Sequence, residues 1–229
     1  MSLLRFAEPH VYTSTDDSIV LWISGRGRGV GSKVFDLSKK SNHGIIYGAT
    51  WVNALVGHSV LSFDGVDDYV DCGNDKSLNI TERITVEVWV KDSGYANESR
   101  YDVVVSKGEY SSYTPYAIFR RYEVGEFEFF LGNGDSYIEL VVAGLGTKWS
   151  HLVGTYDNGV AKLYLNGELK RTGSLLPPLQ VNSQTVKCGG GYTDRFFNGL
   201  IGEVRIYNRA LTAREIRELY NKTKHLFSH

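Results

Sequence analysis

Hydrophobic and polar residues alternate with a period of two in about a dozen short segments of this chain. In the clearest segment, residues 83–91, one face carries only aliphatic side chains: Ile84, Val86, Val88 and Val90. Such alternation indicates a strand that buries one face in a sheet. Further strands are predicted near residues 18–23, 58–63, 68–72, 101–106, 116–122, 126–131, 137–142, 149–156, 160–166, 185–189 and 199–207.

Turn residues separate these segments. Asp157–Gly159 and Asn166–Gly167 are typical of tight hairpin turns. Many short strands with little helix between them favour a sandwich over a parallel α/β sheet. The sequence therefore predicts an all-β protein with two antiparallel sheets.

One helix is predicted near the C-terminus. Thr212 and Glu215 have the spacing of a capping box, in which each side chain bonds to the other's backbone N–H. An apolar stripe around this box is expected to pack on the sandwich: Leu211, Ile216, Leu219 and Tyr220. Residues 222–229 are expected to fray. We interpret residues 16–229 as one domain and residues 1–15 as an N-terminal extension.

The charges of the chain nearly cancel, with 25 Lys and Arg against 26 Asp and Glu, a net charge of −1. This balance argues against a mainly electrostatic nucleic-acid binder and against a polybasic membrane-surface protein. No run approaches the length of apolar sequence that inserts into a membrane. The first nine residues also lack the long apolar stretch of a secretory signal peptide.

The two cysteines, Cys72 and Cys188, lie in strand-like segments and have no zinc-site spacing. Two interpretations stay open. Either both cysteines are buried thiols that act as small apolar residues, or the two form one disulfide. Such a disulfide would close a long loop and would stabilise the fold by about 4–5 kcal/mol in the chain-entropy model.

Five segments resemble, in order, the motifs of one family: Leu61–Val70 (LSFDGVDDYV), Ile84–Lys91 (ITVEVWVK), Trp149–Asp157 (WSHLVGTYD), Leu163–Gly167 (LYLNG) and Phe197–Leu211 (FNGLIGEVRIYNRAL). Over roughly residues 18–220, the chain is similar to the laminin-G-like domains of the concanavalin A-like lectin/glucanase superfamily. The resemblance implies an all-β, two-sheet antiparallel jelly-roll sandwich, here with a short C-terminal helix. Members are mostly extracellular modules that bind glycans, proteins or other surfaces. An extracellular, cell-surface or virion location is therefore expected.

The resemblance also implies a calcium site, because members often bind Ca²⁺. It would bring the oxygen-rich segments 36–42 and 64–71 near Glu203. Ca²⁺ prefers about six to eight oxygen ligands, each about 2.3–2.6 Å from the ion. The candidate ligands are Asp36, Asn42, Asp64, Asp68 and Glu203. Residues 22–31 carry no acid and Gly202 stands where members have Asp, which removes two ligands. The alternative, that these acids cap turns and pair with Lys or Arg, stays open.

Aromatic residues crowd one region beside Arg120 and Arg121: Tyr95, Tyr101, Tyr110, Tyr113, Tyr116, Phe119 and Tyr122. A second loop, residues 192–195, lies between two strands that match the family. Sugar rings have apolar faces that lie on aromatic rings. The candidate ligand-binding residues are Tyr110, Tyr113, Tyr116, Arg120, Tyr192, Asp194 and Arg195. Core packing of some of these rings, or contact with a protein partner, are the alternatives.

Glu126–Phe127–Glu128 superficially resembles the alternating acids of glycanases on this fold, but it lacks their further acidic residues. We interpret Glu126 and Glu128 as the polar face of a strand, with Phe127 and Phe129 on the other face. The chain is therefore predicted to be noncatalytic.

Two functions are compatible with these patterns. The first is a binding module that recognises carbohydrate on a cell or particle surface. The second is a structural or interaction protein, such as a virion, filament or surface-layer subunit, which makes protein contacts and forms homo-oligomers. In that case residues 3–15 would add to the sheet edge of a neighbour.

Overall fold

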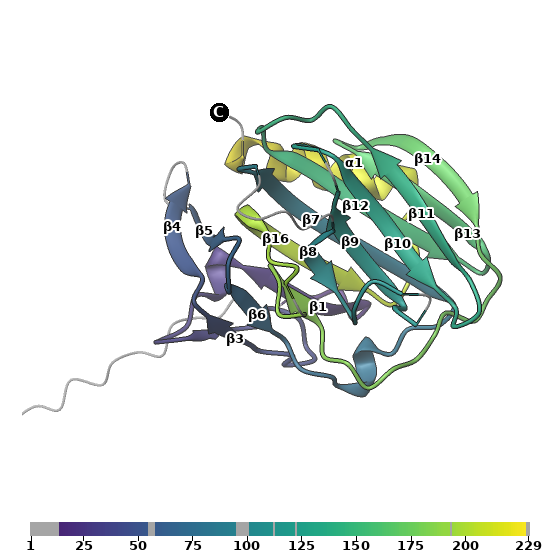
Figure 1. The fold of residues 1–229 in the computed structure, drawn as a ribbon, viewed down its shortest axis with the longest axis horizontal. Coiled ribbons are helices and arrows are strands. Elements are labelled where there is room, and N and C mark those ends of the chain that lie inside the picture. The colour runs from purple at the N-terminus through teal and green to yellow at the C-terminus, as the bar shows by residue number, and fades with distance from the viewer. Residues whose placement is uncertain are drawn as a thin grey trace, which may run out of the picture.

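The computed structural model describes residues 14–54, 58–94, 101–111, 113–121, 123–192 and 194–227. Two antiparallel sheets pack face to face (Figure 1), which confirms the predicted sandwich. Sheet A has the order β14-β13-β12-β7-β16-β5-β4, and β1 also pairs with β16. Its strands are β1 (Ile19–Ser24), β4 (Thr50–Ala54), β5 (His58–Asp64), β7 (Arg83–Asp92), β12 (Ser150–Asp157), β13 (Val160–Leu165), β14 (Glu168–Ser174) and β16 (Asn198–Tyr207).

Sheet B has the order β11-β10-β9-β8-β15-β6-β3-β2. Its strands are β2 (Lys33–Val34), β3 (Gly44–Tyr47), β6 (Tyr69–Asp71), β8 (Asp102–Ser106), β9 (Tyr116–Arg120), β10 (Phe127–Gly132), β11 (Tyr137–Val142) and β15 (Lys187–Cys188). Every strand that the alternation predicts is present. Four strands had no prediction, β2, β3, β4 and β14, because they are short or mainly polar.

The core lies between the sheets and is built by alternate residues of the strands. The four aliphatic side chains predicted on one face of β7 are fully buried there. Phe127 and Phe129 of β10 enter the same core from the other sheet, as predicted. The two predicted hairpin turns join β12 to β13 and β13 to β14, and Asn158 and Asn166 adopt positive φ in them. Burial of alternate residues therefore fixes the strand faces, and the turns fix their pairing.

Cys72 and Cys188 are free thiols in this core. The contact with Cys188 and burial together raise the pKa of the Cys72 thiol. The interpretation of two buried thiols therefore agrees with the structure. Among the described residues, no helix is long and apolar enough to cross a membrane.

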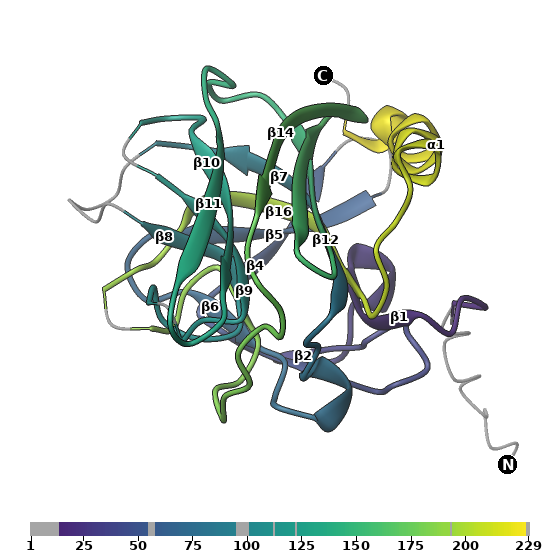
Figure 2. The same ribbon diagram turned by 90° about the vertical axis from the view of Figure 1, so that its right-hand side faces the viewer.

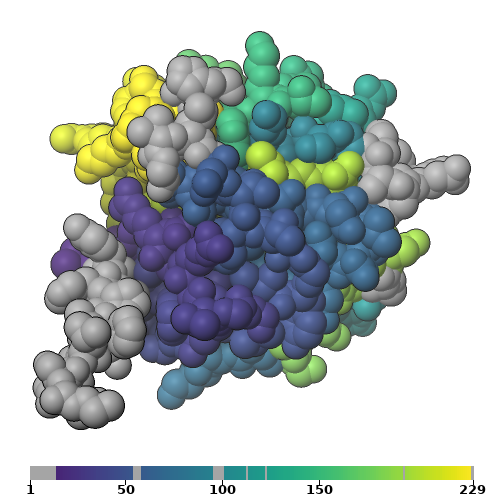
Figure 3. All heavy atoms as spheres, turned by 90° about the vertical axis from the view of Figure 1, so that its left-hand side faces the viewer, coloured from purple at the N-terminus to yellow at the C-terminus, as the bar shows by residue number. Residues whose placement is uncertain are grey.

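The predicted helix, α1 (Ala213–Thr223), begins with the expected capping box between Thr212 and Glu215. It packs on the outer face of sheet A, on the opposite side of the molecule from β10 and β11 (Figure 2). Ile216 and Leu211 are buried there against Val153. In a space-filling view the last described elements lie beside the first (Figure 3), where β1 pairs with β16.

The expectation that residues 222–229 fray is wrong for residues 222–227. A 3-10 turn (Lys224–Leu226) continues α1, and Phe227 is only 2% exposed. Its ring stacks on Trp89 of β7 with the centroids 4.4 Å apart. Gly202 makes this contact possible, because a Cβ there would come within 2.2 Å of the Phe227 ring. This packing explains why glycine replaces the Asp of the family pattern.

A buried polar network lies on the same outer face of sheet A. Glu87 accepts hydrogen bonds from Arg205 (2.7 Å) and Tyr207 (3.0 Å), and its carboxylate lies 3.0 Å from His151 Nε2. Arg205 also pairs with Glu203 at 2.5 Å. Burial alone would raise the pKa of Glu87. The charge of Arg205 and the bonds from His151 and Tyr207 outweigh burial, and the pKa falls to about 2.

We expect Glu87→Gln to remove the acid sensitivity of folding. A carboxyl whose pKa is lowered on folding stabilises the protein above its ordinary value of 4.5, and this stabilisation disappears as the pH falls towards 2. At neutral pH the variant should lose about 3–5 kcal/mol of unfolding free energy, since Arg205 keeps a buried charge. Urea unfolding between about pH 2 and pH 7 measures both effects. The exposed Glu82→Gln is the control, and an unchanged acid slope in Glu87→Gln would contradict the assignment.

Candidate functional site

The outer face of sheet B carries aromatic and charged side chains, whereas α1 covers the outer face of sheet A. In β10, Glu128 and Phe130 point outward between the core residues Phe127, Phe129 and Leu131. Figure 1 looks onto this face, with α1 behind the strands. We call the following set of residues on and above these strands the tyrosine face: Tyr47, Tyr69, Tyr101, Tyr110, Tyr137, Lys187 and Arg195.

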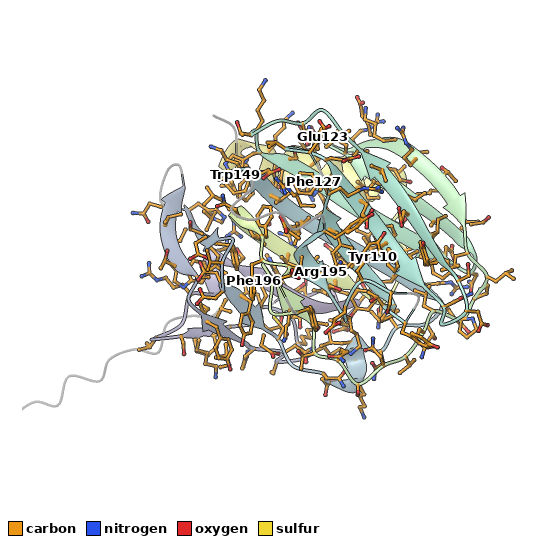
Figure 4. The ribbon with its side chains drawn as sticks, in the orientation of Figure 1. Tyr110, Glu123, Phe127, Trp149, Arg195 and Phe196 are labelled. Carbon is orange, nitrogen blue, oxygen red and sulfur yellow. The ribbon has the colours of Figure 1, made fainter. Side chains whose placement is uncertain are left out.

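Tyr110 occupies the centre of the tyrosine face (Figure 4). Its ring stacks on Tyr101 with centroids 4.1 Å apart and lies 4.9 Å from Phe130. The guanidinium of Arg195 lies 5.3 Å from the Tyr110 ring and 5.8 Å from the Tyr101 ring. Arg195 reaches this position from the loop between β15 and β16. Two segments far apart in sequence therefore build one aromatic and cationic centre.

The accessible rings lie towards the two ends of the tyrosine face. Tyr137 of β11 is 51% exposed and stacks on Phe130 at 5.2 Å. Tyr47 of β3 is 46% exposed and stacks on Tyr69 at 4.5 Å. Between them, Lys187 Nζ lies 5.1 Å from the Tyr69 ring. Each exposed ring is thus held flat by a second ring beneath or beside it.

A group of acids around one arginine supports Tyr110. Arg121 Nη1 donates to Glu128 (2.9 Å) and to Glu139 (3.0 Å), and the Tyr110 hydroxyl donates to Glu139. Glu128 is fully buried, and its Oε1 has no hydrogen-bond partner within the described part of the chain. Burial and the neighbouring Glu139 charge raise the pKa of Glu128 to about 8 despite Arg121. Glu128 lies on the face opposite Phe127 and Phe129, as predicted, but this position is buried, and its raised pKa favours the protonated form at neutral pH.

The structure divides the predicted ligand-binding residues. Tyr110, Arg195 and Tyr192 come together on the outer side of sheet B, although Tyr192 is buried and its hydroxyl donates to the Thr185 carbonyl. Tyr113 and Asp194 are exposed on loops. Tyr95 and Tyr122 lie outside the described residues.

Two of these predictions need correction. Tyr116 lies in the core and donates its hydroxyl to the Leu78 carbonyl at 2.9 Å. Arg120 is fully buried between Asp92 (3.2 Å) and Asp102 (3.1 Å). Both side chains are therefore closed to an external ligand. Crowding in the sequence did not reveal this, because it does not say which face of β9 turns outward.

Sequence reasoning missed several residues of the tyrosine face. They come from strands that either had no prediction or were treated only as core: Tyr47, Tyr69, Tyr137 and Lys187. The supporting Glu139 was missed as well. Alternation within residues 137–142 contained a usable signal, since Tyr137 and Glu139 share the face opposite Ile138 and Leu140. The pairing of β6 with β3 and β15 joins segments that are distant in sequence, so no local pattern could predict it.

The predicted calcium ligands do not meet at one place. Asp36 already accepts four hydrogen bonds, from Trp22 N, Ser38 N, Ser38 Oγ and Asn42 N. The Asn42 amide nitrogen donates to the Val20 carbonyl at 2.7 Å. Glu203 is paired with Arg205. These three residues therefore serve the structure, and the expectation that they join one metal site is corrected.

Asp64 and Asp68 do lie together, with Asp67 as the third carboxylate. One carboxylate oxygen from each of the three lies within 4.8 Å of the others. Burial, together with the charges of Asp64 and Asp67, raises the pKa of Asp68. A divalent cation fits this donor set, because hard oxygen ligands are present and the acids repel one another without it.

Two antiparallel sheets with a capping C-terminal helix define the chain as a jelly-roll sandwich. Residues 64–217 match the laminin G family model described as "Concanavalin A-like lectin/glucanases superfamily". The chain therefore belongs to this family, which confirms the resemblance that the motifs indicated. A 74-residue stretch is also 32% identical to Pappalysin-1 of Mus musculus, over 30% of this chain and 5% of that protein.

Solved structures share the fold. The binding domain of Paraclostridial Mosquitocidal Protein 1 matches with a TM-score of 0.71 at 17% identity, over 90% of this chain and 52% of that one. The binding domain of botulinum neurotoxin serotype D matches with a TM-score of 0.67 at 19% identity, over 90% and 51%. A further serotype D structure, in complex with N-acetylneuraminic acid, matches equally well. The chain thus spans about half the length of each of these proteins.

We expect Glu128→Gln to flatten the alkaline side of the stability profile. A carboxyl whose pKa is raised on folding stabilises the protein fully below its ordinary value of 4.5, and this contribution is lost as the pH rises through about 8. Between about pH 4 and pH 9, the native protein should lose about 5 kcal/mol of unfolding free energy relative to the variant, since the pKa rises from 4.5 to about 8 and each pKa unit is worth about 1.4 kcal/mol. Denaturant titrations at several pH values test this. The exposed Glu123→Gln serves as control (Figure 4), and parallel profiles for all three proteins would refute the assignment.

Proposed function

We propose that this chain is a noncatalytic binding module that recognises carbohydrate through the tyrosine face. The observation that carries the proposal is the pair of accessible, stacked rings, Tyr137 on Phe130 and Tyr47 on Tyr69, at the two ends of the outer side of sheet B. Flat aromatic rings receive the apolar face of a sugar. Arg195 and Lys187 provide donors for its hydroxyl or acidic groups.

The carboxylates of the face favour binding over hydrolysis. Glu128 and Glu139 both accept from one nitrogen of Arg121, and Glu128 is closed to solvent. A glycosidase needs two carboxyl groups that reach the substrate from a groove. Here the pair instead orders Arg121 and Tyr110.

The similar structures support this direction. They are titled binding domains, and one of them is in complex with N-acetylneuraminic acid. The family description also includes lectins. We infer from these similarities that the chain acts outside the cell, at a cell or particle surface, where glycans are displayed.

We expect Tyr137→Ala and Tyr47→Ala each to weaken glycan binding about tenfold, the loss typical of a stacked aromatic anchor. A glycan array identifies the sugar class, and calorimetry then measures the affinity. Tryptophan fluorescence is unsuitable for this face, because Trp22, Trp51 and Trp89 lie in strands of sheet A and Trp149 directly precedes another. Leu169→Ala on β14, 50% exposed in the native protein, is the control. Full affinity in both tyrosine variants would refute the proposal.

Protein contact is the second candidate function. It is favoured by Ile45 and Tyr47, two exposed apolar side chains on β3 next to the short edge strand β2. An interaction or virion subunit would use such an edge to form homo-oligomers. Light scattering distinguishes the two candidates. The segment 3–15 that this function would also use lies mostly outside the described residues.

We also propose a calcium ion at Asp64, Asp67 and Asp68. Millimolar Ca²⁺ should raise the melting temperature, since a ligand at about 100 times its Kd stabilises the folded state by about 2.7 kcal/mol. A chelator should reverse this change. Asp67→Asn should lose the response, whereas the exposed Asp135→Asn should keep it. A melting temperature that does not respond to Ca²⁺ in the native protein would refute the site.

A further inference from the structure

A pocket lies on the side of the molecule away from the tyrosine face, where residues 220–227 meet sheet A. Its volume is about 320 Å³, in the range of small-molecule sites. Its lining residues are Trp89, Trp149, Asn166, Tyr220, Lys224, His225 and Phe227. Neither the proposed glycan function nor the buried network uses this space.

Aromatic rings form the walls of the pocket. Phe227 stacks on Trp89 at 4.4 Å, and Trp149 lies 4.9 Å from Phe227 at an interplanar angle of 54°. Tyr220 stacks on Trp89 from another direction, at 5.8 Å. The Trp89 indole donates to Thr223 Oγ1 at 2.9 Å, which fixes its orientation. These rings pack against one another, so the pocket lies beside them, and the half-buried Trp149 and Tyr220 give it an aromatic wall against which another ring can lie.

Basic residues and the amide of Asn166 also line the pocket. Lys224 Nζ lies 5.5 Å from the Tyr220 ring, and His225 is the adjacent exposed residue. Among the residues that the structure describes, no acidic side chain lines the pocket. Across the described ranges, Lys224 has no ion-pair partner within 4.0 Å. Asn166 uses its Oδ1 to accept from His151 N, which leaves its Nδ2 as a donor.

We propose that this pocket binds a single six-membered ring that carries a carboxylate. The ring lies against the aromatic wall, and the carboxylate pairs with Lys224 and accepts from Asn166. A hexuronic acid unit of a glycan and a free alicyclic or aromatic acid share this chemistry. The site is independent of the tyrosine face, because none of its residues belongs to that face.

Tryptophan fluorescence tests the proposal, because two of the four tryptophans line the pocket. The full chain is titrated with glucuronate and with cyclohexanecarboxylate, and with their neutral counterparts glucose and cyclohexanemethanol. We expect a saturable change with at least one carboxylate and about tenfold weaker binding of its neutral counterpart, as expected for loss of a charge-assisted contact. The carboxylate that binds more tightly identifies the source of the ring.

Matched variants locate the site. Lys224→Gln should weaken carboxylate binding about fivefold or more, whereas Lys222→Gln, an exposed lysine outside this pocket, should leave it unchanged. Tyr137→Ala should also leave it unchanged, which separates this site from the tyrosine face. No saturable change with either acid, equal affinity for acid and neutral compound, or equal losses in both lysine variants would overturn the proposal.

Discussion

Ile216 of α1 and Phe227 bring the end of the chain onto the outer face of sheet A, which β7, β12 and β16 would otherwise expose. Under this cover, Glu87, Arg205 and His151 lose contact with water. Buried charges are tolerated only when they are paired and hydrogen-bonded, and the network around Glu87 meets this condition. The same contact requires glycine at position 202 and creates the aromatic pocket beside Phe227.

The two sheets each bury a glutamate, and the pKa values of these residues move in opposite directions. Glu87 faces Arg205 and two further hydrogen-bond donors, so its charged form is stabilised. Glu128 shares Arg121 with Glu139, so a single cation serves two acids and the buried carboxyl keeps its proton. Each arginine donates hydrogen bonds to two acids, so the additional hydrogen-bond partners of Glu87, His151 and Tyr207, account for the difference in direction. One cluster therefore links β7, β12 and β16 beneath the helix, and the other holds Tyr110 in the tyrosine face.

Family membership determines the fold of this chain but says little about its ligand. The similar toxin domains share this fold at 17–19% identity, a level at which surface residues change freely. A fold of this kind supports many functions, because binding depends on a few side chains placed on it. For this chain we propose the stacked rings and cations of the tyrosine face as those side chains, and the aromatic pocket as a separate set.

The sequence by itself determined the strands, the hairpin turns, the capped helix and the family. These features depend on neighbours within a few residues: alternate burial along β7, Asn-Gly pairs at turns, and Thr212 with Glu215. It also placed Tyr110 and Arg195 among the candidate binding residues. The tertiary structure decided which faces stay open. Tyr116 and Arg120 belong to the same crowded segment as Tyr110, yet they point into the interior, because β9 pairs between β8 and β10 with that face inward. Asp36, Asp64 and Glu203, which were predicted to bind one metal ion, have different partners: Asp36 accepts hydrogen bonds, Asp64 lies beside two other acids, and Glu203 pairs with Arg205. Local patterns predict that successive side chains point to opposite faces of a strand. Only the pairing of distant strands and the residues that cover each sheet determine what each side chain contacts.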